Sequence, residues 1–102
     1  MNAEEKQMCK FIAEHYGEKI QEIQAVQEFT ELMCILTRRA DQRKKMDFRE
    51  ELKGELADCL IMIEQLQQIH GISDGELFNT VEFKLERQLH RIESEVQKNA
   101  TD

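Results

Sequence analysis

Apolar side chains recur every three or four residues along most of this chain, which is the spacing of helices that bury one face. The pattern is interrupted at Gly17, at the basic residues 38–45 and at Gly71. Three residue pairs are typical of helix starts: Asn2 with Glu5, Asp47 with Glu50, and Ser73 with Glu76. The pattern therefore predicts four helices, over about residues 2–16, 18–39, 47–70 and 74–98.

The third predicted helix carries the most apolar stretch of the chain. Its apolar stripe consists of Phe48, Leu52, Leu56, Cys59, Ile63 and Leu66. On a helical wheel Glu64 and Gln68 fall on the polar back, and Ile61 points outward. The last predicted helix has its own stripe, formed by Phe78, Val81, Leu85, Leu89, Ile92 and Val96. We expect the third helix to be the most buried element and the outward Ile61 to favour association between copies of the chain.

Composition agrees with an all-α fold. The 102 residues include no proline and four glycines, and Glu, Gln, Lys, Leu, Ile and Met are plentiful. This length suits a single domain, over residues 1–102, whose stability would gain from oligomerisation. The short connection between the second and third helices predicts that these two pack antiparallel.

Charge and cysteine content exclude several classes of protein. The formal charge of −7 disfavours binding to the phosphate backbone of nucleic acids. No apolar run reaches the roughly 20 residues that span a bilayer, and residues 1–14 do not resemble a secretory signal, so we expect no membrane contact and a cytoplasmic protein. Cys9, Cys34 and Cys59 lack the spacing of a zinc site and are interpreted as free thiols.

Two pairs of carboxylates stand out because they border apolar residues. Glu55 and Asp58 open the apolar stretch of the third helix, and Glu28 and Glu31 have the same spacing in the second. Residues three apart lie on one side of a helix, so each pair can reach a single site. Carboxylates near a core need partners or a metal, and Mg²⁺ prefers oxygen ligands. Facing antiparallel helices would bring the pairs together into one candidate site for a divalent cation.

Basic side chains gather in two places, and each permits two interpretations. The cluster Arg38, Arg39, Arg43, Lys44 and Lys45 is either a solvated helix end with its connection or a loop that faces phosphate. On the last helix Lys84, Arg87 and Arg91 are three and four residues apart. They either form surface ion pairs with neighbouring glutamates or contact a ligand.

The chain resembles the MazG-like all-α nucleoside triphosphate pyrophosphohydrolases in three segments. These are Gln27-Glu28-Phe29-Thr30-Glu31-Leu32, then Gly54-Glu55-Leu56-Ala57-Asp58, and then Ile61-Met62-Ile63-Glu64-Gln65-Leu66. The paired E-x-x-E and E-x-x-D motifs are the signature of that family. The resemblance extends from about Tyr16 through Lys84-Leu85-Glu86-Arg87 and Arg91-Ile92, roughly three quarters of the chain. Family members usually carry a further glutamate before each motif, where this chain has Gln27 and Gly54.

The resemblance implies a four-helix MazG-like bundle that forms homodimers or homotetramers. It implies that Glu28, Glu31, Glu55 and Asp58 hold Mg²⁺, or alternatively Mn²⁺, and carry catalysis. It also implies phosphate contacts from Lys84, Arg87 and Arg91, and a nucleotide pocket lined by Gln21 and Gln24. The expected activity is hydrolysis of a nucleoside triphosphate to the monophosphate and pyrophosphate by metal-assisted attack of water.

Three other functions remain open on the sequence. One is a non-catalytic helical interaction module that keeps the fold, which Gln27 and Gly54 favour. Another is hydrolysis of a phosphoribosyl-nucleotide by the same chemistry. The third, binding of DNA through residues 38–45, is disfavoured by the net charge.

Overall fold

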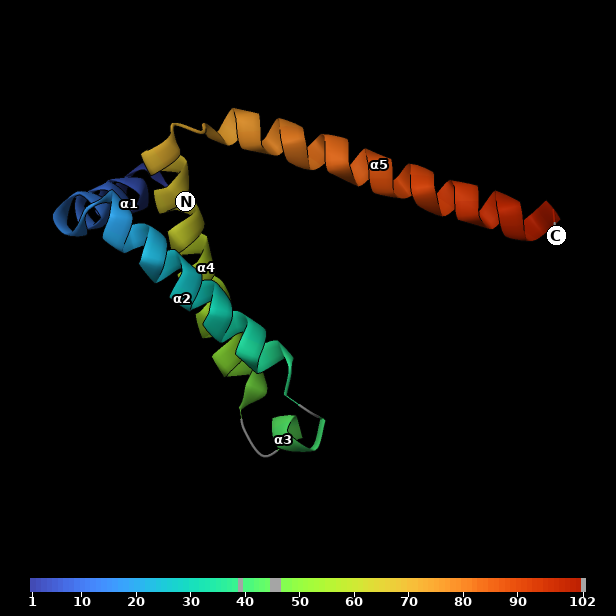
Figure 1. Cartoon of the computed structure of the whole chain (residues 1–102), viewed down its shortest axis with the longest axis horizontal. Coiled ribbons are helices and arrows are strands. Elements are labelled where there is room, and N and C mark those ends of the chain that lie inside the picture. The colour runs from blue at the N-terminus through green and yellow to red at the C-terminus, as the bar shows by residue number, and fades with distance from the viewer. Residues whose placement is uncertain (39, 45–46, 102) are drawn as a thin grey trace. The chain divides into compact units, whose positions relative to one another are not determined.

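The computed structural model describes residues 1–38, 40–44 and 47–101, and these are helical apart from short connections, with no strand among them. The helices are α1 (Ala3–Tyr16), α2 (Glu18–Leu36), α3 (Ala40–Lys44), α4 (Phe48–His70) and α5 (Asp74–Thr101) (Figure 1). The all-α prediction is confirmed. The chain divides into two compact units, Met1–Gly71 and Ile72–Asp102, and each is described by itself.

The predicted helix boundaries follow from local capping. Asn2 and Glu5 form a reciprocal capping box at the start of α1, and Ser73 and Glu76 bond each other in the same way at the start of α5. The Asp47 side chain accepts a hydrogen bond from the backbone N–H of Glu50 at 3.3 Å. Gly17 and Gly71 have positive φ angles of 92° and 68°, which explains the glycine at each helix junction.

The connection between α2 and α4 differs from the predicted one. Helix α2 ends at Leu36 rather than near residue 39, and the short helix α3 lies in the segment interpreted as a helix end and connection. A five-residue helix has too few apolar positions to show a period in the sequence, so periodicity could not predict it. Arg39 and Lys45, two of the predicted basic residues, lie outside the described residues.

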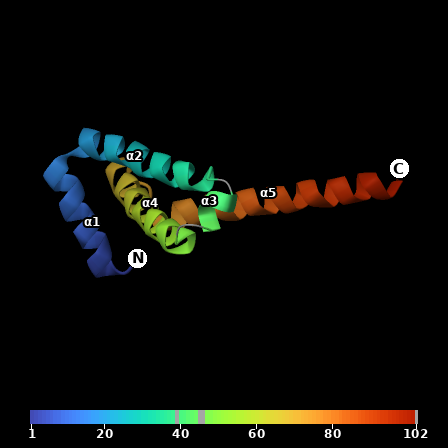
Figure 2. The same cartoon turned by 90° about the horizontal axis from the view of Figure 1, so that it is seen from below.

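Helices α2 and α4 run antiparallel and side by side, and α1 contacts both (Figures 1 and 2). Three contacts along the pair fix the direction. Glu22 meets His70 near one end, the Cys59 thiol lies 3.8 Å from the Glu28 carbonyl oxygen in the middle, and Arg38 pairs with Glu51 at the other end. The predicted antiparallel arrangement of these helices is therefore present.

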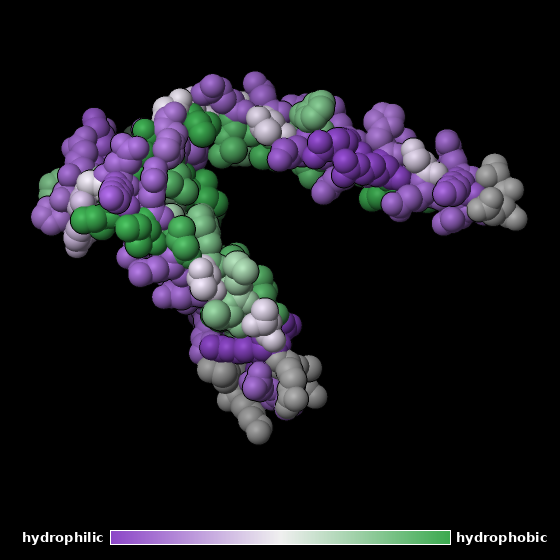
Figure 3. All heavy atoms as spheres, in the orientation of Figure 1, coloured by the Kyte–Doolittle hydropathy of each residue, from purple (hydrophilic) through white to green (hydrophobic). Residues whose placement is uncertain are grey.

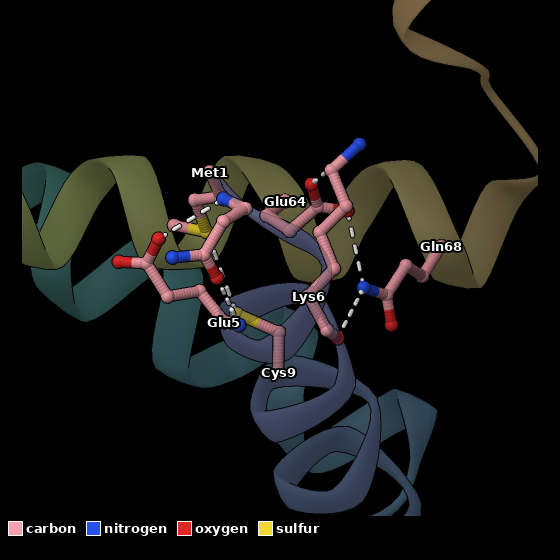
Figure 4. Close-up of polar contacts among 7 residues, drawn as sticks. Met1, Glu5, Lys6, Cys9, Glu64 and Gln68 are labelled. Atoms are coloured by element: carbon pink, nitrogen blue, oxygen red, sulfur yellow. Dashed lines mark hydrogen bonds and ion pairs between the residues drawn. The ribbon is translucent and has the colours of Figure 1, made fainter.

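The buried side of α4 differs from the predicted stripe. Cys59 and Met62 are buried, but Leu56 and Ile63 are exposed, and Glu64 is buried instead of solvated. The cause is α1, which covers the side of α4 that carries Glu64. Figure 4 shows the contacts that result.

Those contacts satisfy most of the polar groups that α1 covers. The Gln68 amide nitrogen donates to the Lys6 carbonyl oxygen at 3.0 Å and to the Glu64 carboxylate at 3.1 Å, and the Lys6 ammonium lies 3.8 Å from the other Glu64 oxygen. Cys9, which is buried nearby, lies 3.8 Å from the Met1 sulfur. Burial raises the pKa of the Cys9 thiol, and the Glu64 carboxylate raises it further. The thiol is therefore neutral at physiological pH.

The buried apolar side chains are few and mostly small, namely Cys9, Ala13, Ala25, Ile35, Cys59 and Met62. Many larger apolar side chains lie at the surface of both units, among charged ones (Figure 3). On α5 the predicted stripe of Phe78, Val81, Leu85, Leu89, Ile92 and Val96 is exposed. None of the described helices is long and apolar enough to cross a membrane.

Gly54 offers a test of the α4 assignment. It lies inside this helix, and a Cβ atom there would have no heavy atom within 4 Å. Alanine restricts the unfolded chain more than glycine does, so Gly54→Ala is expected to raise the free energy of unfolding by about 0.5–1 kcal/mol. Urea denaturation of the full chain measures this change.

Gly71→Ala is the matched control. At a φ of 68° a Cβ atom is strained, so this variant is expected to lose about 1 kcal/mol. A Gly54→Ala protein no more stable than the wild type would contradict the position of Gly54 on an open face of α4.

Candidate metal centre

The α2–α4 pair brings carboxylates from both predicted motifs together. Glu28 of α2 and Glu55 and Asp58 of α4 each place one carboxylate oxygen so that all three oxygens lie within 4.8 Å of one another. Glu31 lies close enough to Glu28 for its charge to raise the pKa of the Glu28 carboxyl, and it lines the same groove as Glu55 and Asp58. Residues more than twenty positions apart therefore meet because the two helices are antiparallel. Oxygens this close can share one divalent cation.

Burial and like charge make this cluster unfavourable without a cation. Burial raises the pKa of the Glu28 carboxyl, and the Asp58 and Glu31 carboxylates raise it further, while the hydrogen bond from Gln24 opposes these effects. The Gln24 amide nitrogen donates to Glu28 Oε1 at 2.8 Å. Only one of the two carboxylate oxygens of Glu28 is thus satisfied by Gln24.

Two oxygens of the cluster are buried without a hydrogen-bond partner among the described residues, Glu28 Oε2 and Glu55 Oε2. A buried carboxylate oxygen with no donor costs more free energy than almost any other side-chain atom. A hard divalent cation removes that cost, because it replaces the missing donors and neutralises the charge. The residues present therefore fit a metal such as Mg²⁺ or Mn²⁺.

Cys59 forms part of the support beneath the carboxylates. It is buried one residue after Asp58, and its thiol points toward the Glu28 carbonyl oxygen. Burial raises its pKa, and the Glu55 and Glu28 carboxylates raise it further. The thiol is therefore neutral and does not compete for a hard cation. All three cysteines are free thiols, as predicted.

A groove of about 540 Å³ opens beside the cluster, along the C-terminal half of α2 and the N-terminal half of α4. Its charged lining consists of Glu31, Arg38, Glu50, Glu51, Glu55 and Asp58. Gly54 also lines this groove. It stands where MazG-like proteins usually carry a glutamate, and a Cβ atom at this position would meet no heavy atom within 4 Å.

The glutamines predicted to line a nucleotide pocket lie in two different environments. Gln24 holds Glu28, as described above. Gln21 is only 5% exposed, and its amide nitrogen donates to Gln65 Oε1 at 2.7 Å inside the α2–α4 interface. Their contact with a nucleotide stays a prediction.

The predicted phosphate contacts Lys84, Arg87 and Arg91 belong to α5, in the second unit. All three are exposed in that unit, and the Arg87 guanidinium lies 6.0 Å from the centre of the Phe83 ring. Their role at a phosphate also stays a prediction.

A second group of possible metal ligands, absent from the sequence interpretation, lies at the other end of the helix pair. Oxygen or nitrogen atoms of Glu18, Glu22 and His70 lie within 4.8 Å of one another. His70 Nε2 is 2.8 Å from Glu22 Oε1, and both side chains are close to half exposed, so a hydrogen bond at the surface accounts for this contact. The two partners are 48 residues apart, which no local pattern reveals.

Compared with known proteins, the chain matches no family model, no curated protein and no solved structure. Its resemblance to the MazG-like proteins therefore depends on the two motifs and the order in which they occur.

Glu28→Gln tests the electrostatic state of the cluster. The pKa of the Glu28 carboxyl is raised in the folded protein. This group therefore stabilises the fold at a pH below its ordinary pKa of 4.5, and the contribution is lost as the pH rises through the folded-state pKa. Without divalent cations, Glu28→Gln is expected to be more stable than the wild type at pH 7, by on the order of 1 kcal/mol for one removed repulsion. This gain should shrink as the pH falls toward 4. Thermal unfolding in a chelator across this pH range measures it.

Glu14→Gln serves as the control, because Glu14 is 68% exposed and has only a 4.0 Å ion pair with Lys10. Its stability should follow the wild type at every pH. A Glu28→Gln protein less stable than the wild type at pH 7 in chelator would show that the carboxylates do not repel one another.

Proposed function

We propose that this protein is a Mg²⁺-dependent nucleoside triphosphate pyrophosphohydrolase with a MazG-like four-helix arrangement. The observation that supports this best is the cluster of Glu28, Glu55 and Asp58 oxygens between antiparallel helices, with two of its oxygens buried and without a described partner. The motifs that resemble the MazG-like family supply these residues. With a net charge of −7, a substrate that carries phosphates would need a bound cation or a local basic patch.

The four carboxylates would hold the metal from two sides, Glu28 and Glu31 from α2 and Glu55 and Asp58 from α4. When bound, Mg²⁺ supplies charge neutralisation for the triphosphate and lowers the pKa of bound water. Gln24 keeps Glu28 oriented through its 2.8 Å hydrogen bond. The buried interface between α2 and α4 excludes water from one side of the cluster, which strengthens its attraction for cations.

In the proposed reaction the water oxygen forms a bond to the α-phosphorus as the anhydride bond between the α- and β-phosphates breaks. The electron pair of that bond leaves with pyrophosphate, and one cluster carboxylate accepts the proton of the water. The products are a nucleoside monophosphate and pyrophosphate.

Association between copies is part of the proposal. The exposed apolar stripe of α5 and the exposed Leu60 and Ile61 of α4 support a homodimer or homotetramer. Lys84, Arg87 and Arg91 of α5 are proposed to contact the phosphates of the substrate.

A non-catalytic module that binds a metal and keeps the fold is the second candidate. Gln27 and Gly54 favour it, because they remove carboxylates next to Glu28 and Glu55 that could assist proton transfer. In that case the metal would act as a structural ligand of the helix pair. Hydrolysis of a phosphoribosyl-nucleotide would use the same site with another substrate.

A panel of ribo- and deoxyribonucleoside triphosphates with Mg²⁺ tests the enzyme. Pyrophosphate release is expected from at least one nucleotide, and Glu55→Gln and Asp58→Asn should each lower kcat by about 100-fold or more, because a catalytic metal contributes several kcal/mol to the transition state. Glu14→Gln, far from the cluster in sequence and exposed, should retain wild-type turnover.

Equal turnover by Glu55→Gln and the wild type would refute the assignment of the site. If Mg²⁺ raises the melting temperature while no nucleotide is hydrolysed, the non-catalytic module is the better description. Release of pyrophosphate from a phosphoribosyl-nucleotide alone would change the substrate and leave the site as proposed.

A further inference from the structure

Among the residues that the structure describes, Arg38 is the one basic side chain in the lining of the groove beside the cluster. The other charged side chains of that lining are the carboxylates of Glu31, Glu50, Glu51, Glu55 and Asp58. These carboxylates repel a polyphosphate that enters the groove, whereas a bound metal and Arg38 would attract it. Arg38 is therefore placed where a ligand phosphate would need a cation.

Arg38 is held in position from both of its ends. Its guanidinium pairs with the Glu51 carboxylate of α4 through Nη1 and Oε2. Its carbonyl oxygen accepts a hydrogen bond from Arg43 Nε at 2.9 Å. Arg38, two residues beyond the end of α2, is thus tied to α4 by its side chain and to α3 by its backbone.

Arg43 belongs to the same basic cluster, residues 38–45, but makes different contacts. Its Nη2 donates to the Leu36 carbonyl oxygen at 2.7 Å, and its guanidinium lies 4.5 Å from the centre of the Phe48 ring. These contacts cap the C-terminal end of α2 and attach it to the start of α4. Arg43 therefore supports the backbone at Arg38, and of these two arginines it is Arg38 that lines the groove.

The pair of Arg38 and Glu51 is too exposed to be explained by stability. The side chains are 28% and 37% exposed, and ion pairs in such surroundings contribute little to folding. A guanidinium carries five donors in a planar fork that matches phosphate as well as carboxylate. A phosphate oxygen can therefore replace Glu51 at little cost to the fold.

We infer that Arg38 is a phosphate-binding residue of this groove, where it contacts the polyphosphate chain of a Mg²⁺-complexed ligand in competition with Glu51. This inference depends on the proposed function for the identity of the ligand as a nucleoside triphosphate. Glu51 acts as an internal competitor that occupies the guanidinium until phosphate arrives.

Inorganic tripolyphosphate with Mg²⁺ is the probe, because it carries the phosphate chain without base or sugar. Titration calorimetry should show that Arg38→Ala weakens its binding by about tenfold or more, as expected for a lost charge-assisted contact. Arg38→Lys should restore part of the affinity, since lysine keeps the charge without the fork. Glu51→Gln should bind more tightly than the wild type, because the competing carboxylate is gone.

Arg49→Ala is the matched control, since Arg49 is 86% exposed, pairs with the neighbouring Glu50 and does not belong to the described lining of the groove. Its affinity for tripolyphosphate should equal that of the wild type. The rise in melting temperature caused by Mg²⁺ alone should be unchanged in Arg38→Ala, which separates phosphate binding from metal binding.

Unchanged affinity for tripolyphosphate in Arg38→Ala overturns the inference. The inference is also overturned if Arg38→Ala and Glu51→Gln lose the same thermal stability while their affinity for tripolyphosphate is unchanged. The pair would then be a structural link between α2 and α4. If the wild type binds tripolyphosphate through Arg38 but hydrolyses no nucleotide, the proposed function fails and the inference stands. If the wild type hydrolyses nucleotides and Arg38→Ala does so with the same KM, the proposed function stands and the inference about Arg38 fails.

Discussion

The packing of α2 against α4 is the constraint on which the rest of the first unit depends. Polar side chains occupy successive turns of this interface: Gln21 meets the buried Gln65, Gln24 holds Glu28, and Glu28 meets the carboxylates of Glu55 and Asp58. The hydrogen bond from Gln21 to Gln65 crosses the interface and is directional, so a shift of one helix along the other would leave these two buried amides without partners. Such a shift is disfavoured more strongly than in an apolar interface, and the position of the carboxylates is fixed with it.

An interface with this much polar surface has a small apolar core. Ala25 and Cys59, with short side chains, allow the helices to approach closely around the carboxylates. The larger apolar residues of α2 and α4 point elsewhere, and Val26, Met33 and Leu60 remain exposed. Apolar area that would normally stabilise the unit internally is therefore available at its surface, which agrees with the proposed association of copies.

Local features of the fold could be predicted from the sequence, and distant ones could not. The capping pairs and the two glycine breaks act within a few residues, so the helix starts at Ala3, Phe48 and Asp74 followed from them. The side of α4 that is buried depends on where α1 packs, and the apolar period alone placed Glu64 wrongly in solvent. The partnership of Gln21 with Gln65 joins residues 44 apart, for which no spacing rule exists.

The candidate site was predictable to the extent that helix geometry governs it. Spacing by three places each carboxylate pair on one side of its helix, and antiparallel packing then brings Glu28 to Glu55 and Asp58. The sequence interpretation could not reveal the roles of Gln24 and Arg38, because these depend on which acceptors and carboxylates face them. Nor could it separate Arg43, which supports the backbone, from Arg38, which lines the groove.

The conflict between stability and charge in this site would be the source of its proposed affinity for a cation. Burial that raises the pKa of Glu28 also lowers the local dielectric response, so the attraction between the cluster and a divalent ion is stronger than it would be in water. The hydrogen bond from Gln24 orients Glu28, and Cys59 packs beneath the carboxylates, so the ligands would need little reorganisation if a cation bound. The free energy that disfavours the metal-free cluster would then be recovered on binding, whereas a site built only of exposed glutamates would recover less.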